Sequence, residues 1–187
     1  MRAGWIGLLA LLMAQGQEPL RVRERIPDAR VAEAAKSTPV AVVTAPAKGA
    51  GDLAERRVEL ERAIENRHLR VSLGEAGTGE RWRVVMVDKG GLVRLVREFE
   101  TSEWAEIPGL LRQWESGRTD FVAYCGGSCH GEDGSNTTYA GGIKSLVGIS
   151  LRRPGMEMIT SAQLAGSIVA GWPKERVEAL LLFMEGL

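Results

Sequence analysis

Two cysteines and a histidine stand close together in the segment Cys125-Gly126-Gly127-Ser128-Cys129-His130. Two thiols a short loop apart can each add across a vinyl group of one porphyrin, and an imidazole beside the second thiol then lies under the iron. The pattern predicts a single covalently attached haem c. Cys125 and Cys129 would be its thioether anchors, and His130 would be the proximal iron ligand.

The same side chains also allow two other kinds of site. A lone cysteine pair in an exported protein is commonly a structural disulfide, and the separation of four residues permits one. A closed zinc site needs four ligands, whereas Cys125, Cys129 and His130 supply three. The remaining histidine, His68, lies between Arg67 and Leu69 and has the surroundings of a surface residue. The disulfide and the zinc site stay open as alternatives.

The segment resembles the attachment motif of class I c-type cytochromes, which is Cys-x-x-Cys-His followed by glycine and often by Asp-Gly. Gly131 and the pair Asp133-Gly134 follow this pattern. Three residues rather than two separate Cys125 from Cys129, so the loop carries one extra residue. Two of the three are glycines, which accept the positive φ angles that a bulge requires.

The resemblance covers residues 107 to 187. Leu146 and Gly148 fit the Pro-x-Leu-x-Gly loop of the family, although Lys144 stands in place of its proline. A capping box at residues 160 to 163 predicts a helix that ends at Gly171, and a last helix is predicted from Pro173 to Gly186. In the family this last helix crosses the helix that carries the first cysteine. The crossing would lie near Gly117, Phe121 and Tyr124 of a helix within residues 107 to 124.

The family usually supplies a methionine as the second iron ligand. Met158 and Met156 lie before the capped helix, and either is a candidate, with Met158 preferred. Met184 falls on the apolar stripe Val177, Leu180, Leu181 and Met184 of the last helix, so packing is its expected role. A methionine ligand raises the reduction potential, whereas an open sixth position binds small gases. An electron carrier and a ligand sensor differ at this position.

The N-terminus has the pattern of an export signal. Arg2 precedes an apolar run from residue 3 to 14, which is too short to span a bilayer, and Ala14 and Gly16 suit cleavage after residue 16. The full chain has 24 basic and 24 acidic residues, and loss of Arg2 leaves 23 against 24. A net charge near zero argues against nucleic acid as a partner. We expect a periplasmic or secreted protein without a transmembrane helix in its mature form.

Residues 17 to 38 are polar and rich in arginine, and predict a linker or a short helix from about Asp28 to Lys36. Residues 39 to 106 contain the elements of a second unit. Strands are predicted at 40 to 44 and 69 to 73, a helix at 52 to 66, and a hairpin of strands 81 to 87 and 92 to 99, with a helix from Thr101 or Ser102. This order is similar to that of thioredoxin-like domains. The unit has no cysteine, so thiol redox chemistry within it is excluded.

The expected fold class is therefore a two-domain α+β chain, with a small thioredoxin-like α/β module followed by an all-α cytochrome c domain. The expected function is the transfer of single electrons between transient redox protein partners, or within a membrane-associated electron-transfer complex, and the chain is not expected to be an enzyme. The alternatives are an exported disulfide-stapled interaction module without haem and a haem-based sensor with an open sixth site.

Overall fold

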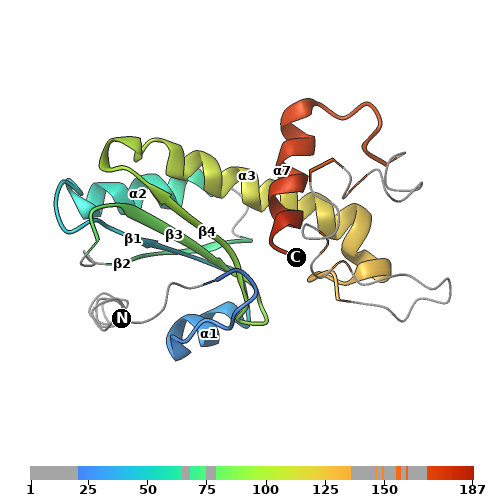
Figure 1. Ribbon diagram of the computed structural model, residues 1–187, viewed down its shortest axis with the longest axis horizontal. Helices are drawn as coiled ribbons and strands as arrows, with labels where there is room; N and C mark the ends of the chain where they lie inside the picture. The colour runs from blue at the N-terminus through green and yellow to red at the C-terminus, as the bar shows by residue number, and fades with distance from the viewer. Residues whose placement is uncertain are drawn as a thin grey trace. The chain divides into compact units, whose positions relative to one another are not determined.

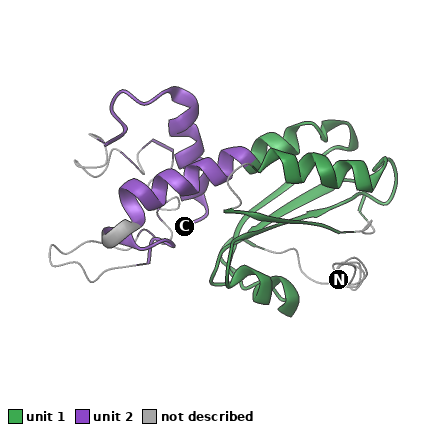
Figure 2. Ribbon diagram, turned by 180° about the vertical axis from the view of Figure 1, so that it is seen from behind, with its two compact units in different colours: residues 1–111 green, residues 112–187 purple. Residues whose placement is uncertain are grey.

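The computed structural model divides the chain into two compact units, residues 1–111 and 112–187 (Figure 2). The structure describes these residues: 21–64, 68–74, 79–135, 146, 149, 155, 156, 159 and 168–187. The expected signal peptide at 1 to 16, the capping box at 160 to 163, and Lys144, Gly148 and Met158 lie outside them.

A four-stranded sheet forms the centre of the first unit, with the strand order β2-β1-β3-β4. β1 (Val40–Thr44) pairs in parallel with β2 (Arg70–Gly74) and antiparallel with β3 (Trp82–Val87). β3 pairs antiparallel with β4 (Val93–Phe99). The sheet is therefore mixed. Its central strand β1 is buried from Val40 to Val43, as the unbroken run of small apolar residues predicts.

Helices cover both faces of this sheet (Figure 1). α1 (Ala29–Ala35) packs Val31, Ala34 and Ala35 into one core with Val40, Val42, Val85, Val87 and Val93. α2 (Leu53–Ala63) lies on the opposite face, where Leu60 is fully buried. Both helices begin as the sequence predicts, because Asp28 and Asp52 each accept hydrogen bonds from two backbone N–H groups of the first turn.

The predicted hairpin is present, and a buried ion pair holds its turn. Gly91 has a φ of 74°, which favours glycine at this position. The Asp88 carboxylate accepts the backbone N–H of Leu92 at 2.9 Å and the Arg94 Nε–H at 2.6 Å. The Arg94 side chain is 3% exposed, so this charge is paired inside the protein.

The described part of the second unit includes the second half of α3 and two further helices whose bounds are known. α3 (Glu106–Phe121) leads directly into a π-helix, Val122–His130, and α7 (Lys174–Glu185) ends the chain. A 3₁₀ turn, Thr101–Glu103, stands where the sequence predicts the start of the third helix, and α3 itself begins three residues later. α7 follows Pro173 and stops at Gly186, as predicted.

α3 and α7 cross at Gly117, as predicted. A Cβ atom built on Gly117 would lie 1.9 Å from the carbonyl oxygen of Ala179, so the two backbones are in contact there. Phe183 packs beside this point, with its ring centroid 5.3 Å from that of Trp114 and 5.1 Å from that of Phe121. The buried face of α7 is Ala179, Leu180, Phe183 and Met184. It is therefore rotated from the predicted stripe, because Val177 and Leu181 are only half-buried.

The predicted fold class is wrong. The chain is an α/β protein with a four-stranded mixed sheet, and its C-terminal part is not an all-α cytochrome c domain; the thioredoxin-like assignment of the N-terminal part is not confirmed. α3 shows why the sequence misleads. Its first residues belong to the sheet-containing unit, where Ile107 and Leu111 are fully buried. Residues 106 to 111 of this helix are thus assigned to the first unit and residues 112 to 121 to the second.

Candidate functional site

The π-helix carries all three residues of the predicted haem motif. The Gly131 N–H donates to the Gly126 carbonyl, five residues earlier, at 2.8 Å. In such a wide turn, residues four and five positions apart stand on the same side of the helix. Cys125, Cys129 and His130 have these separations. The wider helical turn thus spans the extra residue between the cysteines.

Both cysteines are free thiols and half-buried. Burial raises the pKa of the Cys125 thiol to about 11, and the negative charges of Asp120 and Cys129 act in the same direction. Cys125 is therefore protonated at neutral pH.

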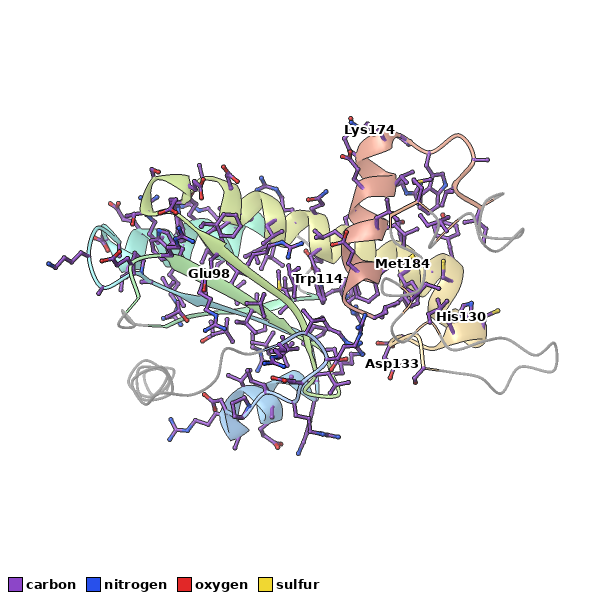
Figure 3. All side chains as sticks on the ribbon, viewed as in Figure 1. Glu98, Trp114, His130, Asp133, Lys174 and Met184 are labelled. Carbon is purple, nitrogen blue, oxygen red and sulfur yellow. The ribbon has the colours of Figure 1, made fainter. Side chains whose placement is uncertain are left out.

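His130 ends the π-helix, and Asp133 follows in the next turn (Figure 3). His130 as a whole is half-buried, while its Nδ1 atom is buried. Two residues later, Glu132 accepts a hydrogen bond from the guanidinium of Arg118 on α3 at 2.7 Å. The Arg118 side chain is 12% exposed. This ion pair ties the backbone that follows His130 to the helix that precedes the cysteines.

The Gly-Glu-Asp-Gly turn after His130 is tightly packed. Gly131 and Gly134 have φ angles of 72° and 74°, which explains the glycines at both positions. The Gly134 carbonyl accepts the backbone N–H of Leu146 at 2.8 Å. A Cβ atom on Gly134 would lie 3.2 Å from side-chain atoms of both Leu146 and Leu187. Leu146, singled out from the sequence, is thus bonded to the turn that follows the motif.

A second charged pair beside the motif was missed by the sequence analysis. Arg176 of α7 donates to both carboxylate oxygens of Asp120, Nε to Oδ2 at 2.9 Å and Nη2 to Oδ1 at 2.8 Å. Asp120 lies five residues before Cys125. The pair joins positions 56 residues apart, and such a separation leaves no local sequence signal.

Of the two methionines predicted as candidates for the sixth iron position, one lies within the described residues. Met156 is an exposed residue, with 47% of its surface accessible to solvent. Met158 lies outside the described residues. Met184 is buried on α7 (Figure 3), in keeping with the packing role predicted for it.

The donor set is compatible with a covalently held haem. Two free thiols lie four residues apart in one π-helix, both are partly exposed, and an imidazole follows the second directly. Within the described residues, no three histidine, cysteine, aspartate or glutamate side chains are grouped so as to hold a metal ion by themselves. In the same part of the chain, no helix is both long and apolar enough to cross a membrane.

Comparison with known proteins adds no relative: no family model matches this chain, and neither a curated protein nor a solved structure matches it.

Proposed function

We propose that this protein attaches one haem through Cys125 and Cys129, with His130 as the proximal ligand of the iron, and carries single electrons between redox partners. The observation that carries the proposal is the π-helix, whose wide turn supports a placement of the two thiols and the imidazole on one side despite the extra residue. The proposal rests on this attachment site and on no cytochrome c fold.

The residues around the motif support a fixed haem position. When bound, a haem supplies a one-electron couple at its iron. Cys125 and Cys129 hold the ring in place, and His130 is held between the π-helix and the turn that Arg118 binds through Glu132. A fixed ligand moves little when the iron changes its oxidation state. The reorganisation energy of each electron transfer is therefore low.

The partners and the location follow from the same proposal. Transient electron-transfer contacts are small, so we expect weak complexes with redox proteins or with a membrane-associated electron-transfer complex. The signal-like N-terminus supports export to the periplasm or beyond the cell, where thiols can be joined to haem.

A haem stain on a denaturing gel, combined with a pyridine haemochrome spectrum, tests the attachment. The protein is exported together with a cytochrome maturation system, and Cys125→Ala and Cys129→Ala are the matched variants. In the parent we expect haem that survives denaturation and a haemochrome spectrum of haem bound through two thioethers. Neither variant should show the spectrum of two thioether bonds. A colourless protein, lighter by the mass of two hydrogens, would instead identify a disulfide-stapled module.

Two further variants test the iron ligands. His130→Ala should retain the covalent haem but lose the low-spin spectrum, because the thioethers remain while the imidazole is gone. An unchanged Soret band would exclude His130 as the ligand. Met158→Ala and Met156→Ala are then compared for spectrum and potential. A reduced spectrum that changes with carbon monoxide would favour an open sixth site and hence a ligand sensor.

A further inference from the structure

A bidentate ion pair joins α3 to α7 five residues before Cys125. The Asp120 carboxylate and the Arg176 guanidinium form two parallel hydrogen bonds, the geometry in which this pair is strongest. The Asp120 side chain is 12% exposed and that of Arg176 is 36% exposed. The carboxylate is therefore poorly screened by water, and its field reaches neighbouring groups.

Two aromatic side chains hold Arg176 in position. Its guanidinium lies 3.8 Å from the ring centroid of Trp172 and 5.4 Å from that of Tyr124. Its Nη2 also donates to the Tyr124 hydroxyl at 3.4 Å. Tyr124 precedes Cys125 directly in the chain. The cation is thus fixed against the residue next to the first thioether anchor.

The field of Asp120 acts on the Cys125 sulfur. After burial, the Asp120 charge is the next largest cause of the raised pKa of this thiol. A carboxylate that disfavours negative charge at the sulfur also disfavours added negative charge on a group bonded to that sulfur. A cation clamped on the carboxylate opposes this effect.

We propose that Asp120 and Arg176 form an electrostatic pair that sets the reduction potential of a haem attached at Cys125, an inference that rests on the proposed function. Reduction adds one electron to the haem. Asp120 favours the oxidised form and Arg176 favours the reduced form, so the intact pair holds the potential between the two limits. Asp120 and Arg176 do not contact the iron in this role; they position charge beside the anchor.

The test measures the midpoint potential of the haem protein and of variants by spectroelectrochemical titration. Asp120→Asn should shift the potential to more positive values, and Arg176→Met should shift it to more negative values. The double variant should lie close to the parent. Arg176→Lys keeps the charge and should keep the potential, even where the loss of the bidentate contact lowers the melting temperature.

Lys174→Met is the matched control. It removes one positive charge from the same helix, two residues from Arg176, and its partner is Glu178 at 3.4 Å. The Lys174 side chain is 84% exposed, so solvent and salt screen its field. We expect no shift in potential. A shift as large as that of Arg176→Met would mean that the net charge of the helix matters and would overturn the role of this pair.

Failure of the inference can be told apart from failure of the proposed function. A parent protein without covalent haem overturns both. A parent with covalent haem whose single variants shift the potential in the same direction, or leave it unchanged, overturns the pair alone. A haem-free readout supports it independently: in a Cys129→Ala background, Asp120→Asn should speed the alkylation of Cys125 at pH 8.5, and Arg176→Met should slow it.

Discussion

At the residue scale, the Cys125 thiol is held in its protonated form by burial and by the charges of Asp120 and Cys129. We expect its alkylation by iodoacetamide in the haem-free Cys129→Ala protein to rise through a pKa above 9.0, the value of an exposed thiol, because burial and Asp120 still act on the sulfur. At pH 8 the raised pKa leaves less of the reactive thiolate than an exposed cysteine has. The same protein unfolded in urea is the control, and equal rates in both states would contradict the prediction.

The same thiol makes stability depend on alkaline pH. Because the folded pKa is raised from 9.0 to about 11, the folded protein retains a proton that the unfolded chain releases. The stability contributed by Cys125 is therefore fully present below pH 9.0 and is lost as pH rises through about 11. The melting temperature should fall more steeply with pH in the haem-free parent than in Cys125→Ser within this window. Equal pH dependence of the two melting temperatures would contradict the linkage.

The residues of the motif could be predicted because their signal is local. Cys125, Cys129 and His130 lie within six consecutive positions, and their chemistry is evident from type and spacing. The charged groups around them could not be predicted, because Arg176 meets Asp120 across 56 positions. Arg118 and Glu132 are closer in the chain, 14 positions apart, yet their contact depends on the path of the turn after His130.

At the element scale, the crossing of α3 and α7 depends on the absence of a side chain at Gly117. Gly117→Ala would place a methyl group against the Ala179 carbonyl, so we expect a loss of about 1–3 kcal/mol in the free energy of unfolding. Gly109→Ala on the same helix is the control, because no described atom lies within 4 Å of its Cβ position. It should be neutral or stabilising by up to about 1 kcal/mol. Urea unfolding followed by circular dichroism measures both.

A deletion can test whether the third residue between the cysteines causes the π-helix. If the third intervening residue widens the turn, removal of Ser128 should restore an α-helical turn in which the two cysteines are three positions apart. Both thiols then remain on one face. We expect covalent haem yield to be retained in this variant, measured by haemochrome absorbance per protein. Loss of haem in the deletion, with retained helicity, would mean that the site requires the π geometry itself.

Element positions could mostly be predicted, whereas their assembly could not. The valine-rich run of β1, the aspartate caps of α1 and α2, and the turn between β3 and β4 act within a few residues. The mixed strand order and the shared helix α3 are set by contacts between distant positions. The sequence does not indicate to which of the two cores Ile107 and Leu111 belong. That ambiguity produced the wrong all-α assignment.

At the scale of the whole molecule, two cores are built from different residues. The core under α1 is made of Val31, Ala34 and Ala35 with valines of β1, β3 and β4, all in the first unit. The aromatic core of Trp114, Phe121 and Phe183 belongs to the second unit, which also contains the haem motif. A ligand that binds one folded unit stabilises that unit by mass action or by covalent restraint.

Haem attachment should therefore raise the stability of one unit more than that of the other. The measurement is differential scanning calorimetry of the haem-bearing protein and of the haem-free Cys125→Ala/Cys129→Ala protein. We expect two transitions, one whose melting temperature rises when haem is attached and one whose melting temperature changes little. The ion pair of Arg94 and Asp88 offers a marker for the sheet unit. Arg94→Met removes the cation that pairs with the largely buried Asp88 carboxylate, and it should lower only the melting temperature of the transition that haem does not shift. If haem and Arg94→Met act on the same transition, the two cores unfold as one because α3 continues through both units.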